Sequence, residues 1–207
     1  MGHLGSSFLL SVSSNIDNFA LGIAYGAKNL EIGILSNLTI AIFSAIGAFL
    51  SMSLGEKLGR FLSADLANLL GFIALLSVGF WGLWDTFRLH KKEVINQKNP
   101  SVNQLDYTIF IEKPETADLD NSHFIDVRES LTLALALTIN NVAGGFGAGL
   151  SGLNIPVTTF LTFLFSLLAI KFGYFMGKKF TSRISAKWSG IISASLIICL
   201  AVYEYFI

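Results

Sequence analysis

Long apolar stretches alternate with short polar connections along the chain. Stretches of roughly 20 mostly apolar residues, the length that an α-helix needs to cross the hydrocarbon core of a bilayer, recur six times. Backbone groups that face lipid must be hydrogen-bonded within their own segment, so each stretch should be helical. The pattern predicts an all-α membrane protein with six transmembrane helices. The expected spans are 4–26, 32–55, 66–87, 129–150, 155–177 and 187–207.

The composition agrees with this interpretation and excludes several other classes. Hydrophobic residues make up 53% and charged residues 14% of the 207 positions, whereas soluble proteins carry about 25% charged residues. The single cysteine, Cys199, cannot form a disulfide within the chain. A formal net charge of zero offers no electrostatic attraction to nucleic acid. We therefore expect the lipid bilayer as the environment and no nucleic-acid partner.

Basic residues fall mainly on one side of the predicted spans. Lys57 and Arg60 lie on the sparse side. Because cytoplasmic loops carry the excess of Lys and Arg, we expect the connection 88–128 to be cytoplasmic and both termini to be outside. The basic residues of the rich side are Lys28, Arg88, Lys91, Lys92, Lys98, Lys113, Arg128, Lys178, Lys179, Arg183 and Lys187.

The two halves of the chain resemble each other in the same order. Residues 16–22 (IDNFALG) match 139–145 (INNVAGG), and the pair 43–44 matches 165–166. Three spans per half place the halves in opposite orientations, an inverted repeat that many transporters use around a substrate site at the midplane. The expected division is a first three-helix repeat at 1–87, a cytoplasmic loop at 88–128 and a second three-helix repeat at 129–207.

Asp17 is the acidic residue nearest to the middle of a predicted span. A charge at the centre of a membrane helix costs about 2.5 to 3.5 kcal/mol on insertion scales, so it should face the bundle interior and have a partner. A hydrogen-bonded Asp that only holds helices together is the structural alternative. Because ionisable residues within membranes usually mark transport paths, we interpret Asp17 as a functional residue.

Oxygen-bearing side chains recur at the depth of Asp17. Carboxylate, amide and hydroxyl oxygens suit hard divalent ions such as Mn²⁺, Mg²⁺ or Ca²⁺. Neighbouring residues of a regular helix point about 100° apart, so a shared ion would require a local helix break. Glycines such as Gly22 and Gly145 would permit either a break or close helix packing, and the serines either ligation or bonds across helices. The candidates are Asp17, Asn18, Asn140, Asn141, Ser44 and Ser166, with Asn15 and Thr138 as weaker ones.

The predicted loop contains an acidic segment, residues 118–129 (DLDNSHFIDVRE), that resembles a twelve-residue EF-hand loop. His123 replaces the glycine that position 6 needs for its sharp turn, and Pro114 stands where an entering helix would run. A divalent-ion site, for Ca²⁺ for example, and a plain acidic linker both stay open. The candidate ligands are Asp118, Asp120, Ser122, Phe124, Asp126 and Glu129.

At these residues the chain resembles the bacterial manganese efflux pump family (MntP-like), whose halves carry a Ser-x-Asp-x-x-Ala/Gly type motif in spans one and four. It is more similar to the YtaF-type sporulation membrane protein branch. The residues that carry this likeness are 16–19 (IDNF), 22–26 (GIAYG), 113–114 (KP) and 117–120 (ADLD).

The resemblance implies a six-span exporter of the bacterial cytoplasmic membrane in which paired membrane acids bind Mn²⁺. Asp17 matches the first of these acids. Asn140 stands where the family usually has a second Asp, which leaves one carboxylate in place of two. The resemblance therefore makes Mn²⁺ the expected substrate and Asn140 the main departure from the pattern.

We therefore predict a secondary transporter, not an enzyme, that exports a divalent cation through a midplane site. Nothing in the sequence resembles an ATP-binding loop, so proton exchange or the membrane potential would drive transport. Two alternatives stay open: an exporter of small organic solutes of the amino-acid type, and a non-transporting membrane metal sensor or scaffold that uses the acidic loop. The oligomeric state is open, a homo-oligomer included.

Overall fold

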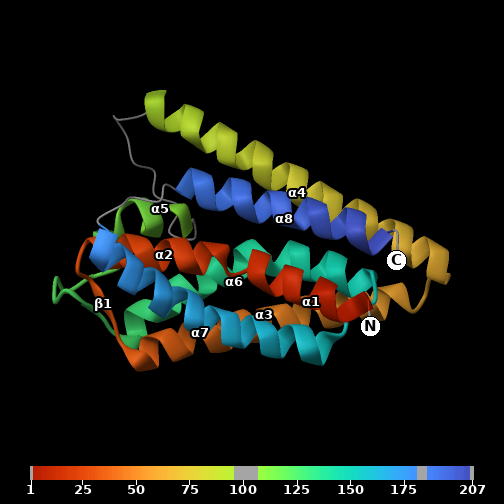
Figure 1. The fold of residues 1–207 in the computed structure, drawn as a ribbon, viewed down its shortest axis with the longest axis horizontal. Coiled ribbons are helices and arrows are strands. Elements are labelled where there is room, and N and C mark those ends of the chain that lie inside the picture. Colours follow the sequence, from red (N-terminus) through yellow and green to blue (C-terminus); the bar gives the residue numbers. More distant parts are fainter. Residues whose placement is uncertain (1, 96–106, 181–185, 206–207) are drawn as a thin grey trace.

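The computed structural model describes residues 2–95, 107–180 and 186–205, and these are largely helical (Figure 1). The chain is a helical membrane protein. Its elements are α1 (Gly2–Ser13), α2 (Ile16–Ala27), β1 (Glu31–Ile32), α3 (Ile34–Gly59), α4 (Ala64–Ile95), α5 (Tyr107–Glu112), the 3₁₀ turn η1 (Pro114–Thr116), β2 (Phe124–Ile125), α6 (Val127–Leu150), α7 (Ile155–Phe180) and α8 (Ala186–Tyr205).

Helices cover every predicted apolar stretch, but not all of them are long enough to cross a bilayer alone. Among the described residues, α3, Asp65–Trp84 of α4 and Ile155–Lys179 of α7 are long and apolar enough. Helix α6 is a fourth if its segments Val127–Ile139 and Asn141–Leu150, which meet at 44°, count as one span. The first predicted span is divided into α1 and α2, which have 12 residues each.

The division between α1 and α2 is caused by the side chain of Asn15. The Asn15 backbone N–H donates to the Val12 carbonyl, three residues back, at 3.1 Å. Its side-chain Nδ2 donates to the Ser11 carbonyl at 2.8 Å, which a continuing α-helix would reserve for a backbone N–H. Asn side chains compete with helical hydrogen bonds in this way. A new helix therefore begins at Ile16, and Asp17 falls in its first turn.

The long helices pack in three pairs, each of which joins the two halves of the chain. Helix α2 lies along α7, α3 along α6, and α4 along α8, while α1 contacts both α7 and α8. Both termini lie at one end of the molecule, and α5 and β1 lie at the other (Figure 1). The helices of the second half therefore pack along those of the first half and do not form a separate unit.

Glycines allow the backbones of α2 and α7 to touch. A Cβ added at Gly22, Gly26, Gly173 or Gly177 would overlap a backbone carbonyl oxygen of the facing helix. The spacing of four residues keeps each pair of glycines on one helix face. Membrane helices associate through such small-residue faces, because lipid removes the hydrophobic driving force between helices. Of the two roles expected for these glycines, the structure shows close packing.

The α3–α6 contact follows the same plan with different residues. A Cβ added at Gly55 or Gly149 would overlap a carbonyl oxygen across the contact, and one added at Gly145 would overlap the Ser51 hydroxyl. Gly145 matches Gly22 in the repeated segment, and Gly149 stands four residues further along, as Gly26 does. The two contacts are therefore related by the internal repeat.

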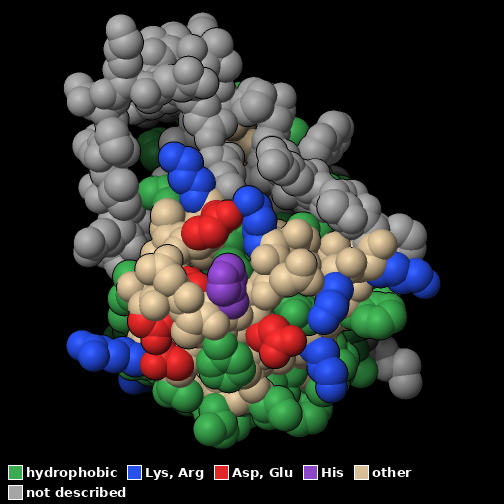
Figure 2. Space-filling view, turned by 90° about the vertical axis from the view of Figure 1, so that its left-hand side faces the viewer, with side chains coloured by type: hydrophobic (Ala, Val, Ile, Leu, Met, Phe, Trp, Pro, Cys, Tyr) green, Lys and Arg blue, Asp and Glu red, His purple; other side chains and the backbone are tan. Residues whose placement is uncertain are grey.

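Charged side chains gather at the end of the molecule that carries α5 and β1 (Figure 2). Lys28 Nζ lies 2.6 Å from Glu115 Oε1 there. Strands β1 and β2 form a parallel bridge in which Glu31 pairs with Phe124 and Ile32 with Ile125. This bridge fastens the acidic segment to the connection between α2 and α3.

Substitution of Gly149 tests the close α3–α6 contact. Overpacking of a tight contact costs about 1–3 kcal/mol, so Gly149→Ala should lower the melting temperature of the detergent-purified protein by several degrees. Gly144→Ala is the matched control on the same helix, because its Cβ would meet only Ile197 Cδ1, at 3.8 Å. Equal melting temperatures for the two variants would contradict the packing described here.

Candidate functional site

Asp17 lies in the first turn of α2 and is 1% exposed. The first N–H groups of a helix lack partners within it, and the helix dipole favours negative charge at this end. The break before Ile16 therefore places a carboxylate where the backbone stabilises it, inside the bundle. Its burial agrees with the interior position expected for a charged residue in a membrane, while its role as a metal ligand stays a prediction.

Asn18 joins α2 to α7 beside Asp17. Its Nδ2 donates to Ser166 Oγ at 2.9 Å and to Asn15 Oδ1 at 2.8 Å, and all three residues are buried. Its Oδ1 is buried and has no hydrogen-bond partner. An unpaired buried oxygen costs about 1–3 kcal/mol, so this amide oxygen is available to a ligand. The structure thus brings together two predicted ligands from different halves.

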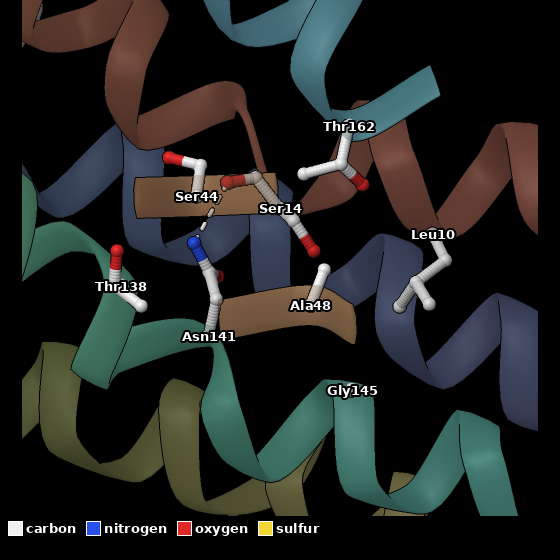
Figure 3. A pocket seen from close by; sticks show the side chains of 8 residues that line it. All are labelled: Leu10, Ser14, Ser44, Ala48, Thr138, Asn141, Gly145 and Thr162. Atoms are coloured by element: carbon white, nitrogen blue, oxygen red, sulfur yellow. Dashed lines mark hydrogen bonds between the residues drawn. The ribbon is translucent and has the colours of Figure 1, made fainter. Parts of the chain in front are cut away.

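The matching residues of the other half line a small pocket between α1, α3, α6 and α7 (Figure 3). Asn141 Nδ2 donates to the Ser14 carbonyl at 2.9 Å and to the Leu137 carbonyl at 3.1 Å. Ser44 faces the same pocket, and the buried Thr138 hydroxyl has no partner. The full lining is Leu10, Ser14, Ser44, Ala48, Thr138, Asn141, Gly145 and Thr162.

A helix break lies at both copies of the repeated motif. In the first half the break falls at Ser14 and Asn15, just before Asp17. In the second half α6 bends by 44° between Ile139 and Asn141. The side chain of Asn140, at the bend, lies outside the part of the chain that the structure describes. The first break precedes Asp17 and Asn18, which both lie within α2, so it does not separate these two neighbours as a shared ion would require.

Sequence reasoning did not single out Ser14 and Thr162, although both line the pocket. The spacing of hydroxyl-bearing residues in the same apolar stretches could have indicated them. Ser7 and Ser11 stand four residues apart in the first apolar stretch, and Thr158 and Thr162 stand four apart in the fifth. Residues with this spacing share one helix face, so two hydroxyl-bearing faces were predictable.

The acidic segment folds into a tight turn built on Asp118 and Asp120. Asp118 accepts hydrogen bonds from the backbone N–H groups of Ser122 at 3.0 Å and His123 at 2.9 Å, and Asp120 accepts one from Ser122 at 3.0 Å. The bonds from Ser122 hold the pKa of Asp120 below its ordinary value. His123 has a φ of 61°, the left-handed conformation that glycine adopts most easily. Histidine thus fills the backbone role of the missing glycine.

Glu129 and Asp126 join this turn to α6. Asp126 Oδ1 accepts from the Glu129 N–H at 2.8 Å and Glu129 Oε2 accepts from the Asp126 N–H at 3.1 Å, which forms a capping box. Carboxylate oxygens of Asp118, Asp120 and Glu129 lie within 4.8 Å of one another. The structure therefore groups three of the six predicted loop ligands. Asp126 acts as a helix cap, and the Ser122 hydroxyl donates to the Phe124 carbonyl at 2.9 Å.

Two proteins of known sequence resemble the chain over most of its length. The proposed sporulation protein YtaF of Bacillus subtilis is 31% identical, over 84% of this chain and 87% of that protein. The chain belongs to the MntP-like/YtaF family. The proposed manganese efflux pump MntP of Aliarcobacter butzleri is 25% identical, with the same shares covered. No family model matches the chain, and no solved structure is significantly similar to it.

Membership of the MntP-like/YtaF family confirms the resemblance found at residues 16–26 and 113–120. The matched part covers 84% of the chain, so the two relatives are similar to it across both halves. Among the candidate midplane residues of this MntP-like/YtaF protein, Asp17 alone is acidic.

The capping box at the start of α6 makes a separate prediction. Loss of an N-cap side chain costs about 1 kcal/mol, so Asp126→Ala should lower the melting temperature and speed amide hydrogen exchange in the first turn of α6. Asp126→Asn is the matched control, because Asn caps helices as well as Asp does. Equal destabilisation by both substitutions would show that the charge of Asp126 matters and its capping does not.

Proposed function

We propose that this protein is a secondary transporter that exports a divalent cation, with Mn²⁺ as the expected substrate. The observation that carries the proposal is the carboxylate of Asp17, which is 1% exposed and lies at a helix N-terminus within a broken membrane segment. Such a group is costly inside a membrane and usually marks an ion path. The relative from Aliarcobacter butzleri, which is named a manganese efflux pump, supports the choice of ion.

The proposed architecture has six membrane-spanning segments in two inverted repeats, 1–87 and 129–207. Helices α1 and α2 together form the first segment, and α8 forms the last. The pairing supports this arrangement: the first segment of each half packs along the second segment of the other half, and the third segments pack together. A two-fold axis in the membrane plane would generate such reciprocal pairs.

The proposed orientation places the end with α5 and β1 in the cytoplasm of a bacterial cell and both termini outside. Basic residues at the α5 end, such as Lys28, Lys113 and Arg128, support this because cytoplasmic loops carry the basic excess. Lys57 and Arg60, which are fewer, lie toward the opposite end. Export then means movement of the cation from the loop end to the end with the termini.

The proposed site holds the ion through oxygen atoms alone. Asp17 supplies the charge, the unpartnered Asn18 Oδ1 supplies a neutral ligand, and Ser166 lies within hydrogen-bonding distance of Asn18. Asn140 and Asn141 of the second half and Ser44 of the first half complete the proposed ligand set. Oxygen ligands favour hard ions such as Mn²⁺, Mg²⁺ and Ca²⁺. With one carboxylate, the site would exchange one proton on Asp17 for each cation.

A specific observation also favours a second candidate function, a metal sensor that uses the acidic loop. Oxygens of Asp118, Asp120 and Glu129 come within 4.8 Å of one another, which suits an ion such as Ca²⁺. These carboxylates already accept backbone N–H groups, so an ion there would compete with the bonds that shape the turn. We therefore rank this function second.

Binding to the purified protein separates the two sites. Removal of the Asp17 charge should weaken Mn²⁺ binding by about tenfold or more, a change of roughly 1.4 kcal/mol or more, in isothermal titration of Asp17→Asn. Asp65→Asn, an exposed carboxylate at the start of α4, is the matched control and should bind as the wild type does. The loop variant with Asp118→Asn and Asp120→Asn should also retain Mn²⁺ binding.

If only the loop variant loses the ion, the sensor replaces the transporter as the leading function. If Asp17→Asn binds Mn²⁺ as tightly as the wild type does, the midplane site is wrong. The same titration with Ca²⁺ and Mg²⁺ ranks the three ions by their affinity for the protein.

Flux in proteoliposomes tests transport itself. The wild type should move Mn²⁺ under an imposed proton gradient, and Asp17→Ala should abolish this movement. Asn140→Asp should tighten Mn²⁺ binding, because a second carboxylate compensates the remaining charge of the divalent ion. A protein that moves no divalent ion under any gradient contradicts the proposal, and movement of amino acids that is independent of Asp17 would favour a solute exporter.

A further inference from the structure

A line of buried hydroxyls runs between α1 and α7. Thr158 Oγ1 donates to Ser7 Oγ at 2.9 Å, and Thr162 Oγ1 donates to Ser11 Oγ at 3.2 Å. The Ser11 hydroxyl in turn donates to the Thr158 carbonyl at 3.2 Å. All four residues are at most 4% exposed. We call these four residues, Ser7, Ser11, Thr158 and Thr162, the hydroxyl seam.

The hydroxyl seam connects the end of the molecule with the termini to the group around Asp17. At its outer end, Thr158 Oγ1 also lies 2.8 Å from the carbonyl oxygen of Asn154, an exposed residue before α7; when the Thr158 proton points to this carbonyl, the Ser7 hydroxyl donates to Thr158 instead. At its inner end, Asn15 Nδ2 donates to the Thr162 carbonyl at 3.3 Å. Asn15 then accepts the bond from Asn18, whose buried Oδ1 has no partner. Polar groups are therefore continuous from the surface to the midplane.

The seam ends at the pocket as well as at Asn18. Thr162 lines the pocket opposite Ser44 and Asn141, and Ser14 lies between them (Figure 3). Asn141 and Ser44 belong to the proposed ligand set. The inner end of the seam thus meets residues of both halves that are proposed to hold the ion.

The other half of the molecule keeps only part of this chemistry at the corresponding contact. Ser11 plus the offset of 123 between residues 16 and 139 gives Ala134, and Thr162 minus the offset of 122 between residues 44 and 166 gives Ile40. Ala134 and Ile40 both belong to a buried apolar cluster. By the same offsets, Ser7 corresponds to Ser130 and Thr158 to Ser36, and both serines are buried. The internal repeat therefore accounts for hydroxyls at the outer pair, Ser7 and Thr158, but not at the inner pair, Ser11 and Thr162.

We propose that the hydroxyl seam lines the path by which the cation passes between the Asp17 site and the membrane surface at the end with the termini. Separation of α1 from α7 would open the path and let water in. Neutral hydroxyl oxygens can replace some of the water around a hard cation, and they hold it weakly enough for it to leave. This inference rests on the proposed function.

The break at Ser14 and Asn15 would allow α1 to separate from α7 without moving α2. Helix α1 contacts α7 through the seam hydroxyls, whereas α2 contacts it through Gly22 and Gly26. Because a break separates the two helices, α1 can move while the glycine contact of α2 with α7 stays closed. Interhelical hydroxyl bonds contribute little to membrane-protein stability, and water replaces them when they open.

Cysteine accessibility tests the path. In a Cys199→Ser parent, which removes the single native thiol, Ser11→Cys and Thr162→Cys should react with a charged, membrane-impermeant methanethiosulfonate reagent in proteoliposomes. Phe8→Cys and Phe160→Cys are matched controls, because Phe8 and Phe160 lie on the same helices beside the seam and are 49% and 65% exposed on the outer surface. Thiolates form in water and not in lipid, so the seam variants should react about tenfold faster or more.

The outcomes separate the path from the proposed function. If the parent moves Mn²⁺ and the seam variants react no faster than the controls, the path is wrong and the proposed function stands. If the parent moves no Mn²⁺, the proposed function fails and the path fails with it. Fast labelling of the seam variants in a parent that moves Mn²⁺, slowed when Mn²⁺ is added, is the result expected.

A second variant separates a path from structural hydrogen bonding. Thr158→Val keeps the side-chain shape and removes one hydroxyl outside the proposed ligand set. We expect it to slow Mn²⁺ flux severalfold with unchanged Mn²⁺ affinity, and Thr158→Ser should restore the flux. A lower melting temperature together with unchanged flux per folded molecule would show that the seam only holds α1 to α7.

Discussion

Contact between helix backbones is the interaction on which the rest of this structure depends. In lipid, the hydrophobic effect does not drive helices together, so apolar side chains alone do not cause the helices to associate. Gly22 and Gly26 on one side, and Gly173 and Gly177 on the other, bring α2 and α7 close enough for a Cβ to overlap a carbonyl oxygen. The equivalent contact of α3 with α6 repeats this arrangement. Because each contact joins one half to the other, polar residues of both halves, such as Asn18 and Ser166, come within hydrogen-bonding distance.

The polar group around Asp17 follows from a second constraint, which is that a broken helix inside an apolar bundle must satisfy its own backbone. The break at Asn15 frees carbonyl groups of α1. The Asn15 side chain donates a hydrogen bond to the Ser11 carbonyl, and the Asn141 side chain of the other half donates one to the Ser14 carbonyl. Asn18 is then held against Asn15. The amides that repair the break are thus found in the same buried group as Asp17, so this polar group and the helix break have one cause.

The sequence was sufficient to predict the helices and the burial of Asp17, because apolar length and the cost of a charge in lipid are local properties. It left the role of Gly22 open, since only the position of α7 decides between a break and a close contact. The break at Asn15 was not predicted, because a side chain that competes for a carbonyl leaves no signature comparable to Pro. The sequence indicated Asn15 only as a weak candidate ligand. The repeat matched Asn18 with Asn141 and Ser44 with Ser166, whereas the hydrogen bond from Asn18 to Ser166 follows from the position of α7. His123 could not be interpreted from residue type alone, since its left-handed backbone depends on the two N–H groups that Asp118 holds.

The two ends of the bundle are closed by different mixtures of contacts, although the halves that form them are related in sequence. At the loop end, Ile40 and Leu133 pack with Tyr25 and Ile125 in one apolar cluster, and the β1–β2 bridge ties Ile125 in place. Opening there would expose apolar surface and break backbone hydrogen bonds. At the α1–α7 contact, opening exchanges hydroxyl bonds for bonds to water, which costs little, but Leu10 of α1 also packs with Leu153 and Ile155 in a second apolar cluster. Under the proposed function, the seam hydroxyls are therefore the part of this contact that water can replace, and the apolar contacts of Leu10 are the part that holds it closed.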